Sequence, residues 1–384
     1  MFSKITQVLI AIPGLMSYLP KGNSLWYFSE NENEYYLNKV LSNIHSVKKI
    51  SGKHNQIAYV DDQTLVVIYG DNSYSVFDPE TLVEKINKPG SGLKITLNHI
   101  RKNHLQSRFI CYDENSPNQK NGLFNIQTES LVCLERDFYP WCFLDGFILG
   151  KKNNNSIILN YNNCHESWRY DVTEIARWRQ YYSEPERPGE VRKFIGVWQD
   201  ELLVALTNHT IIALDIHTGE LKRKWRDVPE EKCQNIAFKG YRAAAIPYPE
   251  GAVLDSEGGK LVGASGIFYW EIDLHTGALL FEEFSAEFGT PLDKVRYSFA
   301  SGRIPVLSGD YLFLIGERYH SSKNANDSEV IAFNRKTQTI DWRYTFPLEE
   351  GVRFGLHLQS PVLEGSRLYV LDTSGTLHIF ERTN

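Results

Sequence analysis

Short runs of hydrophobic residues alternate with polar turns along most of the chain. The stretch TIIALDIHTGELKRKW at residues 210–225 shows the pattern: an apolar run, a polar turn and a second run that contains a tryptophan. Asp215 can accept backbone hydrogen bonds across the turn, and Gly219 can adopt the positive φ that reverses the chain. The stretch therefore predicts a β-hairpin.

The same hairpin pattern recurs along the sequence. Further copies span residues 73–86, 122–134, 156–170, 267–284 and 329–346. Each repeat also has a short run with strong β character, at residues 64–69, 108–112, 147–151, 202–206, 260–264, 311–316 and 367–372. One more short apolar segment precedes each run. Four strands per repeat, at a spacing of roughly fifty residues, are typical of a β-propeller. The sequence therefore predicts an all-β, seven-bladed β-propeller with four-stranded antiparallel blades.

The two ends of the chain are expected to meet in the last blade. After the strand predicted at 376–381, no segment is left for an outer strand, and an open edge would expose unpaired backbone groups. We expect an N-terminal strand to close this blade, with 25–28 and 35–41 as candidates. Residues 1–23 are predicted to form an apolar helix or cap, and residues 24–384 a single propeller.

The clearest copies resemble a known repeat. The hairpin at 211–225 and the stretch PVLEGSRLYVLDTSGTLHIF at 361–380 are similar to the repeat of the quinoprotein-alcohol-dehydrogenase-like propellers, often called PQQ-like repeats. The resemblance implies a propeller that is also WD40-like in architecture, although the Gly-His and Trp-Asp signatures of WD40 repeats are absent. Many members of the family serve as binding or assembly platforms. The vicinal cysteine pair typical of the quinone-dependent dehydrogenases does not occur, so we expect no cofactor.

The amino-acid composition limits the class of partner and indicates the cellular compartment. Aromatic residues make up 13% of the chain, which favours strands, and the net charge of −6 argues against a general nucleic-acid binder. The five cysteines are widely spaced and form no CxxC pair, which indicates buried thiols in a reducing compartment. We therefore expect a cytoplasmic protein without a metal site. The weak similarity of residues 1–20 to a signal peptide leaves export as the alternative. No apolar run is long enough to predict a membrane span.

Loop lengths indicate which face binds. The long segments follow the predicted outer strands, at 87–98, 171–192, 227–251, 285–304 and 347–360. Two insertions at 113–121 and 317–329 join second and third strands. In a propeller all of these segments open on one face, and loops on a rigid scaffold usually carry the binding residues. This loop-rich face is the predicted binding face.

Arginines precede the innermost strands of three consecutive blades on this face. They are Arg242, Arg296 and Arg353, and each follows an apolar or aromatic residue. Guanidinium groups at the mouth of the channel would suit a carboxylate, a phosphate or an acidic loop of a partner. The alternative is that each arginine ties its loop to carbonyl groups of the neighbouring blade.

The insertion at 170–192 is predicted to contain a helix. The spacing of Asp171 and Glu174 resembles a capping box, and helix formers continue to Tyr182. Ile175, Trp178 and Tyr182 would share a face that packs on the propeller. Arginine and tyrosine are enriched at interface hot spots, so this helix, placed at about 171–190, is the predicted protein contact. Its contact residues are Arg177, Trp178, Arg179 and Tyr181.

No enzyme signature stands out, since the HExxH, GxSxG, P-loop and Rossmann motifs are all absent. The leading hypothesis is a non-enzymatic propeller that binds a protein partner as a subunit, adaptor or inhibitor in a bacterial system. A small-ligand or carbohydrate-active lyase or hydrolase is the alternative, with Tyr297, His104 and His357 as candidate acid–base groups. A quinone-dependent dehydrogenase is the third hypothesis. The predicted binding residues are Arg177, Trp178, Arg179, Tyr181, Arg242, Arg296, Tyr297, Arg353 and His357.

Overall fold

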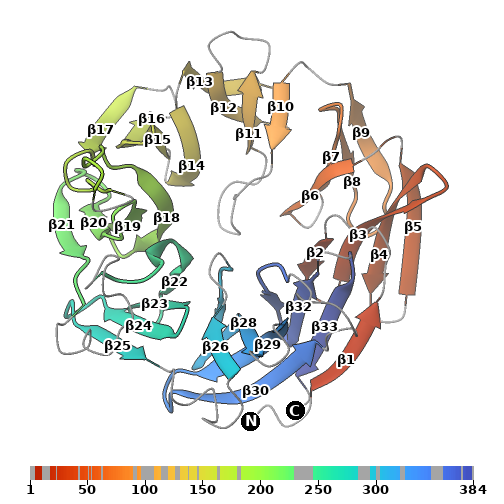
Figure 1. Cartoon of the computed structure of the whole chain (residues 1–384). Coiled ribbons are helices and arrows are strands. Elements are labelled where there is room, and N and C mark those ends of the chain that lie inside the picture. Colours follow the sequence, from red (N-terminus) through yellow and green to blue (C-terminus); the bar gives the residue numbers. More distant parts are fainter. Residues whose placement is uncertain are drawn as a thin grey trace. The chain divides into compact units, whose positions relative to one another are not determined.

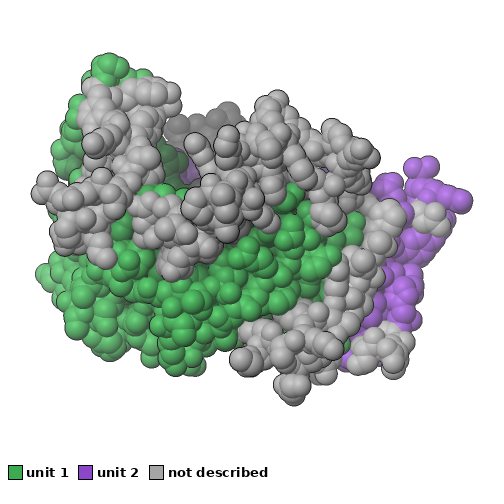
Figure 2. All heavy atoms as spheres, turned by 60° about the horizontal axis from the view of Figure 1, so that its bottom comes forward, with its two compact units in different colours: residues 1–11, 173–384 green, residues 12–172 purple. Residues whose placement is uncertain are grey.

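The computed structural model describes most of the strands and many of the turns of the chain. The described residues are 5–10, 18–22, 24–41, 44–50, 52, 54–61, 64–89, 93–96, 108–113, 120–125, 130–136, 138–144, 147–161, 165–179, 183–228, 245–283, 295–299, 303–320, 325–346, 358–372 and 375–382. The chain divides into two compact units (Figure 2): unit 1 contains residues 1–11 and 173–384, and unit 2 contains residues 12–172.

Unit 2 contains four antiparallel sheets within the described residues, each made of four strands in chain order. The strands are β2 (Tyr18–Lys21), β3 (Ser24–Asn31), β4 (Glu34–Leu41), β5 (Ile44–Ile50), β6 (His54–Asp61), β7 (Thr64–Tyr69), β8 (Tyr74–Phe77), β9 (Glu84–Lys88), β10 (Leu93–Thr96), β11 (Arg108–Asp113), β12 (Lys120–Asn125), β13 (Ser130–Arg136), β14 (Phe138–Leu144), β15 (Phe147–Lys152), β16 (Ser156–Tyr161) and β17 (Glu166–Asp171).

Unit 1 also contributes four sheets to the described part of the chain (Figure 1). Two of these sheets, β18–β21 and β22–β25, have their strands in chain order. The third sheet has the order β26-β28-β29-β30, and β27 also pairs with β28. The fourth sheet has the order β1-β33-β32-β31. The elements are β1 (Ile5–Ile10), β18 (Val191–Trp198), β19 (Glu201–Leu206), β20 (Ile211–Asp215), β21 (Leu221–Trp225), the 3-10 helix η2 (Pro249–Gly251), β22 (Val253–Asp255), β23 (Lys260–Ser265), β24 (Phe268–Asp273), β25 (Leu279–Glu283), β26 (Val295–Phe299), β27 (Val306–Ser308), β28 (Tyr311–His320), β29 (Ala325–Asn334), β30 (Thr339–Phe346), β31 (Val362–Glu364), β32 (Arg367–Leu371) and β33 (Leu377–Arg382).

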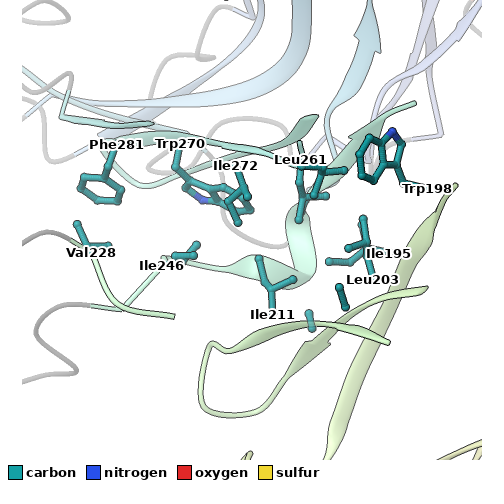
Figure 3. Packing of buried hydrophobic residues seen from close by; sticks show 14 of the residues in the cluster. Ile195, Trp198, Leu203, Ile211, Val228, Ile246, Leu261, Trp270, Ile272 and Phe281 are labelled. Carbon is teal, nitrogen blue, oxygen red and sulfur yellow. The ribbon is translucent and has the colours of Figure 1, made fainter. Parts of the chain in front are cut away.

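The second and third strands of the sheet β18–β21 are apolar because both of their faces are covered. In β19 and β20 every residue from Leu202 to Leu206 and from Ile211 to Leu214 is buried. The outer strand β21 (LKRKW) instead alternates exposed and half-buried residues. Side chains of the sheets β18–β21 and β22–β25 face each other in one shared core (Figure 3), in which Trp270 is fully buried. Neighbouring sheets are thus held together by apolar burial between them.

The predicted hairpin turns form as expected. The Asp215 carboxylate accepts hydrogen bonds from the backbone N–H groups of His217 and Thr218, at 3.0 and 2.9 Å. Gly219 has φ of 74°, a conformation that residues with a Cβ rarely adopt. Asp78, Asp273 and Asn334 accept equivalent backbone hydrogen bonds in their own turns. The repeat read from the sequence therefore corresponds to a repeated structural turn.

The all-β class and the four-stranded antiparallel sheets are confirmed. Each of the seven predicted blades is present, and its marker strand is the second strand of a sheet: β7, β11, β15, β19, β23, β28 and β32. An eighth sheet, β2–β5, spans Tyr18–Ile50. The sequence pattern predicts a cap and candidate closing strands in this segment, so this sheet is not among the seven predicted blades.

An N-terminal strand does complete the last sheet, as predicted, but it is a different strand. β1 pairs with β33 in an antiparallel register that runs from Ile5 opposite Arg382 to Ile10 opposite Leu377. The predicted N-terminal helix or cap at 1–23 is therefore wrong, because its described residues form β1 and β2. A short apolar run fits a helix and a buried strand equally well, and here the pairing with β33 decides. The predicted domain boundary at residue 24 also falls inside the sheet β2–β5.

Two segments predicted as loops are partly strands. β28 and β29 pair over ten residues each, from Tyr311 opposite Asn334 to His320 opposite Ala325. The outer strand β30 pairs with β29 only as far as Ser328 opposite Phe346, so the hairpin extends beyond it. β26 pairs with this extension of β28 (Figure 1). The insertion at 317–329 and the segment at 285–304 thus lengthen one sheet instead of forming only loops.

Candidate functional site

The N-terminal ends of the first strands in unit 1 lie at one end of their sheets. β22 lies beside β18 and beside β27, so the first strands are neighbours. Because the sheets are antiparallel, the turn between the second and third strands lies at the same end. We call this surface of unit 1 the entry face. It includes the described residues that precede four strands, and it contains the candidate site. These residues are 173–179 and 183–190 before β18, 245–252 before β22, 303–305 before β27 and 358–361 before β31.

Segment 173–190, before β18, is firmly anchored to the turn between β19 and β20. Asn208 Nδ2 donates to the Ile175 carbonyl at 2.9 Å, and Thr207 Oγ1 donates to the Ala176 carbonyl at 3.1 Å. The Thr207 hydroxyl also accepts the backbone N–H of Glu190 at 3.1 Å. Gly189 packs so closely on Ala176 that a Cβ at this position would lie 2.1 Å from the Ala176 Cβ. The two ends of the segment, at 175–176 and 189–190, are therefore fixed on the turn between β19 and β20.

The predicted helix at about 171–190 is wrong for the residues that the structure describes. Residues 173–176 form a turn, and Trp178 then pairs with Arg187 in an antiparallel bridge with backbone hydrogen bonds of 3.2 and 2.7 Å. The physical reason is competition for carbonyl groups. In a helix the carbonyls of Ile175 and Ala176 would accept backbone N–H groups of the next turn, but here Asn208 and Thr207 bond to them.

Trp178 is the aromatic centre of this loop. Its ring is half-buried, and the guanidinium of Arg192, an exposed residue of β18, lies 6.0 Å from the ring centroid. Arg187 pairs with Glu184 and Arg177 with Glu174, whereas Arg192 forms no ion pair with any described carboxylate. A guanidinium stacked on an indole keeps its N–H edges available to another molecule. Trp178 and Arg192 therefore form a preorganised contact point.

The segment before β22 presents a strained tyrosine. Tyr248 has φ of 48° and ψ of 57°, which is left-handed backbone that a bulky side chain rarely adopts. The chain is fixed around it, since His209 Nδ1 lies 2.9 Å from the Ile246 carbonyl oxygen and Trp270 Nε1 donates to the Pro247 carbonyl at 3.1 Å. Backbone strain of this kind is found at functional sites more often than elsewhere.

Two cations lie at the starts of the neighbouring strands β18 and β27, and the first of them contacts this tyrosine segment. Lys193, in β18, donates its ammonium to the Glu250 carbonyl at 2.5 Å. Arg303, just before β27, donates Nε to the Leu358 carbonyl. Burial raises the pKa of Tyr248, the Glu250 carboxylate raises it further, and the charge of Arg303 acts in the opposite direction. Tyr248 thus remains a neutral hydroxyl group.

The structure describes only part of the predicted site. Arg177, Trp178 and Arg179 lie in the anchored loop, and Arg177 is neutralised by Glu174, with hydrogen bonds of 2.7 and 2.8 Å. Arg296 and Tyr297 lie in β26, in register with Tyr319 and Arg318 of β28. The remaining predicted residues, and His104, lie outside the described residues: Tyr181, Arg242, Arg353 and His357.

Sequence reasoning missed Arg192, Lys193, Tyr248 and Arg303 as a group. The prediction that arginines gather before the first strands stays a prediction, because Arg242 and Arg353 lie outside the described residues. Arg303, which it did not name, lies just before β27. A signal was available in the stretches YPEGAVL, GRIPVL and QSPVL, which align on the strand starts at Val253, Val306 and Val362. Tyr248 and Arg303 stand a few residues before the first two of these strands.

The described part of the chain contains no group of three or more His, Cys, Asp or Glu side chains that could hold a metal ion. None of its helices is long and apolar enough to span a membrane.

Comparison with known proteins shows the fold but no family. No family model matches the chain, and no curated protein matches it either. Among solved structures, the C-terminal WD40 domain of Sif2 has a TM-score of 0.58 at 11% identity, with 99% of each chain covered. Sqt1 of Saccharomyces cerevisiae has a TM-score of 0.56 at 11% identity, with 98% of each chain covered. The computationally designed protein Ika8 has a TM-score of 0.54 at 10% identity and covers 98% of this chain and 100% of its own. The chain therefore has a β-propeller fold, and identities this low carry no information on its activity.

Proposed function

We propose that the chain is a non-enzymatic β-propeller scaffold that binds a protein partner through the entry face of unit 1. The observation that supports this most strongly is the Trp178 loop. It is anchored by Thr207 and Asn208 and carries a half-buried indole under the exposed guanidinium of Arg192. Tryptophan and arginine dominate the energetics of protein interfaces, above all where they are held rigidly before binding.

The contact is expected to depend on shape as well as on charge. The loop carries paired charges at Arg177 and Arg187, so its net attraction for a charged surface is small. A partner that covers Trp178 would remove water from the ring and from Arg192 together. We therefore expect binding to weaken on salt addition but to persist, because exposed charges are screened and the apolar contact is not.

The test has two stages. First, proteins bound by the tagged chain are captured from the organism that encodes it, identified, and the strongest candidate is purified. Its dissociation constant is then measured with the wild-type chain, with Trp178→Ala and with Arg192→Gln. We expect the affinity to fall on the order of tenfold or more for Trp178→Ala, because a hot-spot residue contributes at least this much.

Lys336→Gln is the matched control for Arg192→Gln. Lys336 is exposed in the turn between β29 and β30, at the opposite end of its sheet, and it pairs with Asp310. This variant should bind as the wild type does. If Trp178→Ala and Arg192→Gln also bind the purified partner with unchanged affinity, the proposed surface is wrong.

A further inference from the structure

Two consecutive residues of β18 contact two different segments of the entry face. The Arg192 guanidinium lies 6.0 Å from the centroid of the Trp178 ring, and the Lys193 ammonium donates to the Glu250 carbonyl at 2.5 Å. Glu250 belongs to residues 245–252, which we call the Tyr248 segment. Consecutive Cα atoms are about 3.8 Å apart, so one short piece of strand contacts both the Trp178 loop and the Tyr248 segment. The two segments are therefore close enough to share one interface, which typically covers about 800 Å² on each partner.

Arg192 occupies a β-bulge. Between Val191 and Lys193, β18 has one residue more than the stretch of β19 that it pairs with, and that residue is Arg192. A bulge turns a side chain out of the regular alternation of a strand, and bulges are frequent beside functional sites. In β18 the bulged residue is the one whose side chain lies over Trp178.

The turn between β19 and β20 also holds both segments. Thr207 Oγ1 donates to the Ala176 carbonyl at 3.1 Å, and His209 Nδ1 lies 2.9 Å from the Ile246 carbonyl oxygen. Ile246 itself is fully buried in the core shared by the sheets β18–β21 and β22–β25 (Figure 3). Two separate supports, β18 and this turn, therefore fix the spacing between the Trp178 loop and the Tyr248 segment.

Tyr248 is held in a costly backbone conformation within its segment. Its φ of 48° and ψ of 57° are left-handed, a conformation that is unfavourable for a bulky residue. Gly251 lies so close to the ring that a Cβ there would be 2.4 Å from Cδ1, which fixes one side of the ring. The residue is half-buried, and within the described residues nothing hydrogen-bonds to its hydroxyl group. A strained backbone, a fixed ring and an unused hydroxyl group favour a contact with another molecule.

The two ends of this surface differ in charge. Arg192 is exposed and pairs with no described carboxylate, whereas Arg177 and Arg187 of the loop are paired with glutamates of the loop itself. At the other end, Glu250 carries a negative charge two residues from Tyr248. The Arg192 end therefore suits an acidic side chain, and the Tyr248 end suits an uncharged hydrogen-bond acceptor such as a backbone carbonyl.

We propose that the Trp178 loop and the Tyr248 segment form one continuous binding surface, on which Tyr248 is a second anchor for the protein partner. The partner presents an acidic side chain to Arg192 and an uncharged hydrogen-bond acceptor to the Tyr248 hydroxyl. This inference rests on the proposed function, because it concerns the same partner, and it adds a contact that the loop alone does not provide.

Substitutions at Tyr248 separate the role of the ring from that of the backbone. The dissociation constant of the purified partner is measured with Tyr248→Ala, which removes the ring and keeps the strain, and with Tyr248→Gly, which removes both. Both should weaken binding on the order of tenfold. Tyr248→Gly should melt at a higher temperature than Tyr248→Ala, because glycine adopts this φ freely. Tyr248→Phe should weaken binding by about three- to tenfold, through the loss of a neutral hydrogen bond.

Arg192→Glu tests the acidic side chain of the partner. It should weaken binding on the order of tenfold more than Arg192→Gln does, because like charges would then face each other. Gln338→Gly is the matched control for the glycine substitution. Gln338 has φ of 58° in the turn between β29 and β30, at the opposite end of its sheet. This variant should bind the partner as the wild type does.

Thermal unfolding of each variant is recorded to show that it is folded. The inference is overturned if folded Tyr248→Ala and Tyr248→Gly bind as the wild type does, if Tyr248→Gly restores an affinity that Tyr248→Ala loses, or if Arg192→Glu binds no more weakly than Arg192→Gln. When Trp178→Ala weakens binding and the Tyr248 variants do not, the proposed function stands and this inference fails. Unchanged affinity in Trp178→Ala would instead contradict the loop contact on which both depend.

Discussion

Arg335 Nε lies 2.7 Å from Glu271 Oε1, so that a guanidinium from the sheet β26–β30 pairs with a buried carboxylate of the sheet β22–β25. The same guanidinium reaches Asp255 at 2.9 Å, and Lys260 contacts the other Glu271 oxygen at 2.7 Å. The hydroxyl of Tyr269 also donates to Glu271. This ionic cluster joins two sheets that otherwise meet through an apolar core.

The cluster replaces hydrophobic residues of the repeat. Arg335 lies in the turn between β29 and β30. In the equivalent turns that follow β20 and β24, the position of Arg335 is occupied by the buried residues Ile216 and Leu274. The position of Glu271 in its strand is taken by buried Ala213 in the preceding sheet. The junction between the sheets β22–β25 and β26–β30 therefore has a negative group on one side and a positive group on the other, at positions that are apolar in the matching repeats.

The first prediction is that these two residues are strongly coupled. Arg335→Leu alone leaves a buried carboxylate without its main partner and should lower the free energy of unfolding by about 3–5 kcal/mol. The double variant Arg335→Leu with Glu271→Ala has apolar residues at both positions, as the matching repeats do. It should recover most of the lost free energy of unfolding. Chemical denaturation of the wild type, both single variants and the double variant gives the coupling. Additive effects of the two substitutions would contradict the account.

The second prediction concerns acid stability. Burial works against ionisation of Glu271, but hydrogen bonds from Arg335, Lys260 and Tyr269 outweigh it and lower its pKa. A lowered folded-state pKa means that the carboxylate contributes stability above its ordinary pKa of about 4.3, and that this contribution is lost as the pH falls through the folded value. The difference in unfolding free energy between wild type and Glu271→Gln should therefore shrink as the pH is lowered below about 4.5. A difference that stays constant or grows in acid would show that Glu271 is not held ionised.

The third prediction concerns β1. Removing residues 1–11 deletes the strand that pairs with β33 from Leu377 to Arg382 and leaves that edge open. We expect a lower melting temperature and self-association, because an open edge recruits other strands. Light scattering and thermal unfolding measure both effects, and a synthetic peptide of residues 3–12 should partly reverse them. A truncated chain that stays monomeric with an unchanged melting temperature would show that β1 does not seal the sheet.

The strands and turns of the repeat were predictable from sequence because their signals are local. The alternation of polar and apolar residues, and side chains such as Asp215 and Asp273 that bond to their own turn, require no knowledge of distant residues. The missing features all depend on distant contacts. β1 is defined by its pairing with β33, and segment 173–190 is prevented from forming a helix by Asn208 and Thr207, about thirty residues along the chain.

The buried ionic cluster and the candidate site were harder to predict for the same reason. Arg335 in a polar turn and Arg303 before a strand are indistinguishable, in sequence, from solvent-facing arginines. Only the structure shows that the first is buried against Glu271 and that the second donates to the Leu358 carbonyl. The left-handed backbone of Tyr248 likewise has no sequence signature, since the residue type that favours this conformation is glycine.

The fourth prediction tests the rigidity of the Trp178 loop. In Gly189→Ala the new Cβ would lie 2.1 Å from the Ala176 Cβ and 2.3 Å from its carbonyl oxygen, so the loop must move. We expect a loss of about 1–3 kcal/mol in unfolding free energy and a weaker partner affinity. Gly52→Ala is the control, because nothing lies within 4 Å of its Cβ position. Partner affinity that is unaffected by Gly189→Ala would mean that the fixed shape of the loop is irrelevant to binding.

The central claim is that a protein partner binds the entry face of unit 1. Hydrogen–deuterium exchange of the chain with and without its purified partner tests this claim most directly. The account predicts slower exchange on binding in residues 173–192 and 245–252, and unchanged exchange in the turns at 215–219 and 273–277 at the other end of the sheets. Protection confined to those turns, with none at 173–192 or 245–252, would contradict it.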